Sequence, residues 1–429
     1  NAVAITSISA VADDPTVLVD NQGPQVTSVS LSATGGQNGY LNVGDVLTVT
    51  VNFDSTAWDK NFANSGSSYG SQISINVGGV TRDALYASGD GTNQFTFNYT
   101  IQASDVDANG ISIDLNALGT GMSYAGGFHY LDIVDGNGYG LTAGQNLAVA
   151  DNPSLKVDNT APTVSAVAIT GATGVRNHYL NAGDTVTFSV TLSEAAALDT
   201  TNGSPRLKLD VGGSTVYATY VAGSSTSTVL AFSYTIQSGQ TDGSGIAVPQ
   251  NGFELNGATM GDLAGNAATI THAALADNAS YMVDTTAPNV PTVTAATFNS
   301  TAAKIIGGTL SGGLSANSVS VTINGATYAL SSSNFSGNNW SLNLDSTTPT
   351  SGSLATWHDG SYNAAVLVTD LAGNTGQDAT TNEISLHLTA PNAPSITSVS
   401  DNVGVYTGSI ASGGITDDRN LKLHIDLTG

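Results

Sequence analysis

Aspartate residues recur at matched positions in this chain, and their carboxylates suit a hard cation. Three stretches each place an aspartate four residues before a proline, and these aspartates are Asp20, Asp158 and Asp284. Proline fixes its own φ and keeps the preceding residue extended, so each stretch is expected to join two segments tautly. Ca²⁺ binds carboxylate, amide and backbone oxygens. We therefore expect these aspartates to gather oxygen ligands where one domain meets the next.

Two further repeated motifs supply candidate ligands. The turns Tyr40-Leu-Asn-Val-Gly-Asp45 and Tyr179-Leu-Asn-Ala-Gly-Asp184 would bring Asp45 and Asp184 to the same joints if they lie at the facing end of each domain. Asp262-Leu-Ala-Gly-Asn266 and Asp370-Leu-Ala-Gly-Asn374 are predicted tight turns in which glycine supplies a positive φ. An altered copy, with Asp132 and Asp135, runs Asp132-Ile-Val-Asp-Gly-Asn137.

Weaker candidates complete the set. Asp105 and Asp107 have the alternating spacing of a calcium loop but lack its terminal glutamate. Three more aspartates lie just upstream of the joints: Asp13, Asp151 and Asp277. For every member of the set the alternative is an Asx turn, in which the carboxylate binds the chain's own backbone.

The charge balance is strongly acidic. The chain of 429 residues has 33 acidic and nine basic residues, for a net charge of −24, and only three acids are glutamates. Aspartate favours turns more than glutamate does, so most carboxylates are expected in loops. Solubility is the alternative explanation. The acidity argues against nucleic acid and anionic membrane surfaces as partners.

Other absences bound the class of protein. The chain has no cysteine, which excludes disulfides and thiolate chemistry and favours a bacterial source for a secreted protein. No apolar run has the length of a membrane span. Its six histidines are scattered, and no catalytic motif occurs, so no catalytic residue is predicted. Trp58, placed in a predicted long polar loop over residues 54–71, is the one tryptophan that we expect to be available to a sugar.

Strand patterns and turn signals fill the intervals between the joints. Leu47–Phe53 and Val186–Leu192 alternate apolar and polar residues, as half-buried strands do, and no helical periodicity is found. The prolines at 24, 162, 288 and 391 lie 138, 126 and 103 residues apart, which indicates whole domains in tandem. Short strands at this density predict an all-β fold of tandem immunoglobulin-like sandwiches in an extended array.

The predicted domains follow from these boundaries. The motifs of the second domain match those of the first in the same order, so the two domains are expected to share one fold. The third domain differs in its first half and is predicted to contain a long strand over 360–370. We expect the chain to be an excerpt of something longer. The predicted segments are a terminal strand (1–22), three domains (23–158, 159–284 and 285–389) and an incomplete domain (390–429).

The tandem Tyr-Leu-Asn-x-Gly-Asp, Phe-x-Tyr-Thr-Ile and Asp-Leu-Ala-Gly-Asn motifs resemble the bacterial immunoglobulin-like (BIg) repeats of giant RTX-type surface adhesins. Trp340-Ser-Leu and Gly360-Ser-Tyr resemble a second subtype of these repeats, and the resemblance covers nearly the whole chain. It implies an extracellular array at the bacterial cell surface or in a biofilm, exported by type I secretion and stiffened by Ca²⁺. The altered first-domain motif and the missing aspartate before Pro391 depart from the pattern.

The resulting hypothesis is a calcium-stiffened extender that holds adhesive domains away from a cell. Its partners would be neighbouring repeats, and a cell-surface or matrix polysaccharide or protein bound by domains outside this excerpt. One alternative is a structural subunit that associates laterally into a filament, matrix or surface layer. Another is the non-catalytic arm of a secreted polysaccharide-degrading enzyme.

Overall fold

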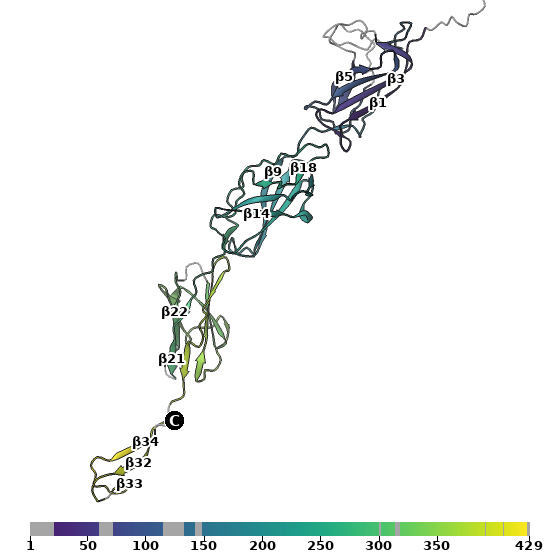
Figure 1. The fold of residues 1–429 in the computed structure, drawn as a ribbon. Helices are drawn as coiled ribbons and strands as arrows, with labels where there is room; N and C mark the ends of the chain where they lie inside the picture. Colours follow the sequence, from purple (N-terminus) through teal and green to yellow (C-terminus); the bar gives the residue numbers. More distant parts are fainter. Residues whose placement is uncertain are drawn as a thin grey trace, which may run out of the picture.

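The computed structural model describes residues 21–59, 72–114, 133–141, 148–299, 302–313, 318–390, 392–405 and 407–426. Within these ranges the regular structure is β-strand, apart from the short 3-10 helices η1 (Ala222–Ser224) and η2 (Ser332–Asn334). None of the described helices is long and apolar enough to cross a membrane. Figure 1 shows the strands grouped into bodies that follow one another along an extended chain. We call these bodies units 1 to 4.

Unit 1 contains a sheet with the order β1-β3-β6-β5-β4, and β7 pairs with the far end of β3. The short strands β2 and β8 pair in parallel, which brings Leu41 beside Val157 just before the joint. Its strands are β1 (Val26–Thr34), β2 (Tyr40–Leu41), β3 (Val46–Asp59), β4 (Gln72–Val77), β5 (Val80–Ser88), β6 (Thr92–Thr100), β7 (Ile133–Val134) and β8 (Lys156–Val157).

Unit 2 repeats this plan. Its main sheet has the order β17-β13-β14-β15-β11-β9, and β10 pairs in parallel with β19 just before the next joint. Its strands are β9 (Val164–Thr173), β10 (Tyr179–Leu180), β11 (Thr185–Leu192), β12 (Ala197–Asp199), β13 (Arg206–Val211), β14 (Ser214–Tyr220), β15 (Val229–Thr235), β16 (Thr241–Asp242), β17 (Phe253–Glu254), β18 (Thr259–Gly261) and β19 (Met282–Asp284).

Unit 3 places two sheets, β20-β22-β26-β25 and β27-β24-β23-β29-β30, beside the small sheet β21-β31-β28. Its strands are β20 (Thr292–Val293), β21 (Ala296–Asn299), β22 (Ile305–Thr309), β23 (Ser318–Ile323), β24 (Ala326–Leu330), β25 (Phe335–Ser336), β26 (Asn339–Asn343), β27 (Ser351–Gly352), β28 (Gly360–Tyr362), β29 (Ala364–Thr369), β30 (Thr375–Gln377) and β31 (Ile384–His387). Unit 4 has three described strands in the order β33-β32-β34: β32 (Ser395–Asp401), β33 (Gly408–Ile410) and β34 (Lys422–Asp426).

Each of the first three units has its own apolar core. In β3 the side chains of Leu47, Val49 and Val51 are fully buried, while the intervening threonines point outward. The predicted alternation is confirmed here, because side chains of a strand alternate between the two faces of a sheet. Equivalent cores are built around Phe188 and Phe232 in unit 2, and around Tyr328 and neighbouring strands in unit 3. The chain is therefore an all-β array of immunoglobulin-like sandwiches.

Two predicted elements were wrong in their extent. Residues 54–59, expected in a loop, continue β3, because Ala57 is buried against β6 and Trp58 pairs with Val134 of β7. Residues 60–71 of that predicted loop lie outside the described residues. The predicted strand over 360–370 is two strands, β28 and β29, because the chain passes from the sheet of β31 to the sheet of β23 at this point.

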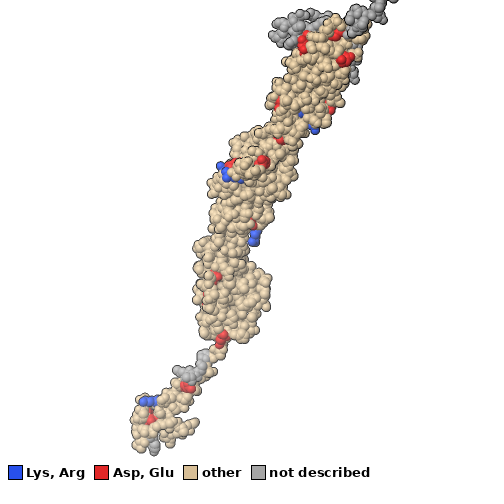
Figure 2. Space-filling model, turned by 45° about the vertical axis from the view of Figure 1, so that its right-hand side comes forward, with Lys and Arg blue, Asp and Glu red and all other residues tan. Residues whose placement is uncertain are grey.

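The face of the molecule shown in Figure 2 is mostly uncharged despite the net charge. Figure 2 shows acidic side chains scattered along the visible face, with basic side chains at a few places between them. Acidic groups are therefore spread over the array rather than concentrated in one visible patch.

Candidate metal centre and the domain joints

The turn Asp262–Asn266 is closed by its own residues. The Asn266 N–H donates to Oδ1 of Asp262 at 2.8 Å, and the Asn266 side-chain amide donates to Oδ2 at 2.8 Å. Gly265 has a φ of +92°, a conformation that favours glycine. These contacts hold the Asp262 carboxylate in one orientation at the end of unit 2 that faces unit 1.

The same turn docks on unit 1 through three side-chain amides. Asn38 Nδ2 donates to the backbone oxygen of Leu263 at 3.0 Å, and Asn42 Nδ2 donates to that of Ala264 at 2.9 Å. In the reverse direction, Asn266 Nδ2 donates to the backbone oxygen of Asp158 at 2.8 Å. We call this set of three hydrogen bonds the amide clasp. The amide clasp brings together three motifs that the sequence repeats: the turn after β2, the linker before Pro162 and the turn Asp262–Asn266.

The joint between units 2 and 3 repeats the amide clasp residue for residue. Asn177 Nδ2 donates to Leu371 O at 3.1 Å, Asn181 Nδ2 to Ala372 O at 3.0 Å, and Asn374 Nδ2 to Asp284 O at 2.8 Å. Unit 3 has a different arrangement of strands from unit 2, yet presents the same turn in the same way. The amide clasp therefore forms with both of these strand arrangements in the following unit.

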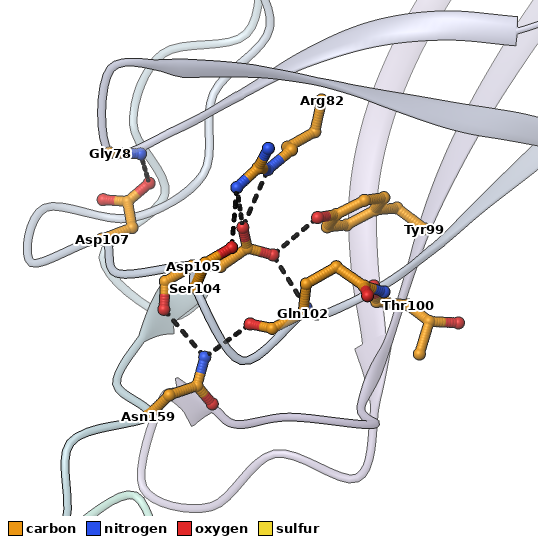
Figure 3. Close-up of polar contacts among 9 residues, drawn as sticks. All are labelled: Gly78, Arg82, Tyr99, Thr100, Gln102, Ser104, Asp105, Asp107 and Asn159. Carbon is orange, nitrogen blue, oxygen red and sulfur yellow. Dashed lines mark hydrogen bonds and ion pairs between the residues drawn. The ribbon is translucent and has the colours of Figure 1, made fainter.

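The linker is also attached to the unit before it. Asn159 Nδ2 donates to the backbone oxygens of Gln102 and Asp105, at 2.9 and 2.8 Å (Figure 3). In the second joint, Thr285 Oγ1 takes the place of this amide and donates to Gln240 O at 2.8 Å. Each linker is thus held on both sides, by the unit it leaves and by the turn of the unit it enters.

Three carboxylates gather at the first joint. Asp158, Glu194 and Asp262 each offer an oxygen, and these three atoms lie within 4.8 Å of one another. Burial, together with the negative charges of Asp158 and Asp262, raises the pKa of the Glu194 carboxyl. Like charges at this separation disfavour ionisation unless a cation lies between them.

Oε1 of Glu194, a member of this cluster, is buried and has no hydrogen-bond partner. A buried polar atom without a partner is costly, and a cation bound by the cluster would satisfy this oxygen. Three carboxylates are a donor set that Ca²⁺ accepts. In the linker next to Asp158, Oδ1 of Asn159 is also buried without a partner. We call Asp158, Glu194 and Asp262 the acidic triad.

Glu194 was missed by sequence reasoning. It is one of three glutamates in a chain whose other acids are aspartates, and it lies two residues after the end of β11. A glutamate near a strand end, in a chain that otherwise uses aspartate, was the one sequence feature that could have marked Glu194 as a candidate ligand. Its approach to Asp158 and Asp262 depends on how unit 2 sits against the linker, which local sequence does not encode.

The linker aspartates of the two joints also bond to their own backbone. Asp158 Oδ1 accepts the Thr160 N–H and Asp284 Oδ1 accepts the Thr286 N–H, both at 2.9 Å, so each also forms an Asx turn. Asp284 and Asp370 face the second joint, but among the described residues the acidic triad is the one group of three carboxylates at metal-ligand spacing. The two joints therefore differ in their carboxylates.

Asp45 and Asp184 shape the docking turns. Oδ2 of Asp45 accepts the Asn42 N–H at 2.9 Å, and Oδ2 of Asp184 accepts the Asn181 N–H at 2.8 Å. These bonds orient the two asparagines that form the amide clasp. The turns face the joints as the sequence analysis required, and their carboxylates are not part of the acidic triad.

Asp105 is held by protein groups (Figure 3). Its carboxylate accepts hydrogen bonds from Tyr99 Oη at 2.6 Å and from the Gln102 N–H at 2.8 Å, and it forms an ion pair with Arg82 at 2.7 Å. Burial opposes ionisation of Asp105, but the hydrogen bonds from Tyr99, Gln102 and Arg82 outweigh it and lower its pKa. In unit 2 the corresponding residue is the neutral Gln240, whose Oε1 accepts the Gln237 N–H and whose Nε2 donates to Tyr234 Oη, the reverse of the direction at Tyr99.

Asp107 organises a loop. Its carboxylate accepts the N–H groups of Gly78 at 2.8 Å and Gly110 at 2.7 Å, and Asp242 does the same for Gly212 and Gly245 in unit 2. The repeated pattern is an Asx-type loop that ties a hairpin to the following segment.

Asp135 is the true counterpart of Asp262. Its Oδ1 accepts the Tyr139 N–H at 2.8 Å, as Asp262 accepts that of Asn266, so the sequence alignment that began at Asp132 was shifted. Oδ2 of Asp135 is buried without a partner. Of the remaining candidates, Asp151 accepts a hydrogen bond from Asn109 and Asp277 is exposed. Asp13, Asp20 and Asp132 lie outside the described residues.

No protein-family model and no curated protein sequence matches the chain. Solved structures that match include the FN1–FN3 domains of chicken CNTN1, at 10% identity over 82% of this chain and 98% of that chain, with a TM-score of 0.25. SGBP-B of the Bacteroides ovatus mixed-linkage glucan utilization locus, in complex with a heptasaccharide, matches at 14% identity over 90% and 74%, with a TM-score of 0.16. The BSP domain of a biofilm associated protein matches at 11% identity over 91% and 87%, with a TM-score of 0.20. Scores this low carry no functional argument, so the proposal below rests on the joints.

Proposed function

We propose that this chain is a non-catalytic extender of a bacterial surface adhesin, which holds adhesive domains at a distance from the cell. The observation that carries the proposal is the amide clasp, which occurs with the same partners at two successive joints. A spacer needs joints that resist bending, whereas a chain of independent binding modules does not.

The amide clasp suits this role because its bonds are spread over the joint. A single hydrogen bond would leave the next unit free to swing, but bonds at Leu263, Ala264 and Asn266 restrain its tilt about more than one axis. The linker prolines restrict the backbone between them. The orientation of one sandwich therefore restricts the orientation of the next.

Calcium is proposed to stiffen the first joint further. The acidic triad draws one ligand from the linker and two from unit 2, and the adjacent Asn159 is bonded to unit 1. A divalent cation bound there would neutralise mutually repelling carboxylates. Asp158 and Asn159 would then be tied to Glu194 and Asp262 across the joint.

The experiment is small-angle X-ray scattering of the full chain with calcium and then with excess chelator. We expect chelation to shorten or broaden the distance distribution, and the Glu194→Gln variant in calcium to give the chelated profile. The matched control is Glu254→Gln, which removes a glutamate of unit 2 that pairs with Arg206 away from the triad. A profile unchanged by chelation would refute the calcium-stiffened extender and favour lateral assembly as the next hypothesis to test.

A further inference from the structure

The sheet of unit 4 is apolar on one face and polar on the other. Residues that pair across antiparallel strands share a face: Ile396 lies opposite Ile425, and Val399 lies between Ile410 and Leu423. Because Leu423 and Ile425 are alternate residues of β34, all five side chains belong to the same face, which we call the unit 4 face. The pairs on the reverse face are polar, and they are Ser398 with His424, Ser400 with Lys422, and Ser400 with Ser409.

The unit 4 face is open. The exposed fractions of Ile396, Leu423 and Ile425 are 61%, 54% and 51%, whereas Leu47 and Val49 of unit 1 are fully buried. Seven of the twenty large apolar side chains that are exposed in the described part of the chain lie between residues 396 and 425. Single exposed apolar residues are normal on a protein surface, but a group of them on one small unit is the mark of an interaction surface.

The other units indicate what covers such a face. In each of units 1 to 3 the apolar side chains are buried in a core between layers of strands, as an amphipathic sheet requires. The described residues of unit 4 form one sheet, which Figure 1 shows as a single layer at the end of the array, away from the strands of unit 3. Three residues follow β34 in this chain, too few for a second sheet. The cover for the unit 4 face therefore has to come from outside unit 4.

A second copy of the chain offers the matching surface. Residues 392–426 have four aspartates, one arginine and one lysine, so their net charge is −2, against −24 for the whole chain. Repulsion between two copies is therefore weak at unit 4. The charged residues of β34, Lys422 and Asp426, alternate with Leu423 and Ile425 and thus project from the polar face. Neither of these charges is buried when two unit 4 faces meet.

We propose that two copies of this chain pair tail to tail through unit 4, with one unit 4 face packed on the other. The contact is self-complementary, so a two-fold axis relates the copies and the pair is closed. It reproduces between two chains the packing of strand layers that units 1 to 3 have within one chain. The inference goes beyond the proposed function, because it gives the spacer a contact with a second spacer, and it needs no metal.

The area of the unit 4 face sets the strength of the pair. Three strands of five residues cover about 14 by 17 Å. This area is smaller than the roughly 800 Å² that each partner contributes to a stable interface. We therefore expect a weak, reversible dimer whose population rises with concentration. Copies held close together on a surface have the high effective concentration that such a contact requires.

Sedimentation velocity of the full chain, over a wide range of concentrations and in chelator, tests the pairing apart from any effect of calcium. We expect a dimer to replace the monomer as the concentration rises. Leu423→Lys places a charge on the unit 4 face and should leave the chain monomeric throughout. His424→Lys is the matched control, because it places the same charge on the next residue of β34, which belongs to the polar face, and it should keep the dimer.

Hydrogen exchange of the β34 amide groups shows whether unit 4 stays folded in Leu423→Lys, and Ile396→Ser is a milder second variant on the same face. A monomer at every concentration would overturn the inference and leave the face to strands of a different polypeptide. Oligomers that grow beyond the dimer would assign the contact to open strand edges and would overturn it as well. So would a dimer that neither Leu423→Lys nor Ile396→Ser weakens.

Discussion

The side-chain amide of Asn266 donates to the backbone oxygen of Asp158 at 2.8 Å, across a joint and over 108 residues of sequence. The same amide also donates to Oδ2 of Asp262. One asparagine therefore closes its own turn, orients a carboxylate of the acidic triad and fastens the linker. Its counterpart Asn374 closes its own turn, orients the Asp370 carboxylate and bonds to the backbone oxygen of Asp284. Among the described residues, Asp370 belongs to no group of three carboxylates.

Asn266→Ala should loosen the first joint and leave the second intact. The variant loses both side-chain hydrogen bonds, each of which contributes about 1 kcal/mol of net stability. Spin labels can be attached to cysteines introduced at exposed strand residues, because the chain has no cysteine of its own. We expect the distance distribution between labels on Ala87→Cys and Thr215→Cys, in units 1 and 2, to widen, while that between labels on Thr215→Cys and Ala329→Cys, in units 2 and 3, stays the same. Asn374→Ala is the matched variant and should give the reverse pattern. Equal widening at both joints in either variant would show that the clasp does not act locally.

Glu194 should make metal-free stability depend on pH in a defined window. Its pKa is raised in the folded chain above the ordinary value of 4.5, so folded Glu194 holds its proton more tightly than unfolded Glu194 does. The resulting loss of stability is absent below pH 4.5, grows as the pH rises, and is complete above the folded pKa. In chelator, lowering the pH from 7 toward 5 should therefore stabilise unit 2, as followed by calorimetry.

Glu194→Gln should remove this pH dependence and the response to calcium together. The contribution of Asp105 is separable, because its lowered pKa gives stability that is present above the ordinary value of 3.8 and lost as the pH falls through the folded pKa. A stability profile of the Glu194→Gln variant that still rises between pH 7 and 5 would assign the effect to other groups.

Gly265→Ala should weaken the first joint by backbone strain. Gly265 has a φ of +92°, and an alanine there costs about 1–2 kcal/mol and displaces the Gln37 amide. Gly44→Ala is the control at the same joint, because Gly44 has a φ of +95° but open space around its Cβ. We expect both variants to lower the melting temperature, and Gly265→Ala alone to increase cleavage of the 158–162 linker by protease. Equal cleavage in the two variants would exclude a specific contact at Gly265.

The sequence was informative where structure is local. Alternation at Leu47, Val49 and Val51 predicted a half-buried strand, and the repeated Asn-x-Gly-Asp turns were expected to face the joints. The extent of β3 was underestimated, because burial of Ala57 and pairing of Trp58 come from strands distant in sequence. Turn-forming residues alone indicated a loop there.

The candidate site was predictable only in part, for a similar reason. Asp158 and Asp262 stood out because they recur, and each recurrence reflects a turn that is closed locally. Glu194 does not recur, and its distance from the other two carboxylates is set by the docking of unit 2 on the linker. A search for repeated residues therefore finds the amide clasp and misses the residue that distinguishes one joint from the next.

A double-mutant cycle at Arg82 and Asp105 would test why these residues are charged in unit 1. Their counterparts in unit 2 are Val216 and Gln240, and Gln240 keeps the bond to a tyrosine hydroxyl. Arg82→Val alone leaves the buried Asp105 carboxylate without its ion pair and should destabilise unit 1. Adding Asp105→Gln should restore most of that loss, because the neutral pair has a working precedent in the same chain. Calorimetric unfolding of the two single variants and the double variant gives the coupling energy directly. Additive losses would instead assign Asp105 a role beyond pairing with Arg82, and would return it to the set of candidate metal ligands.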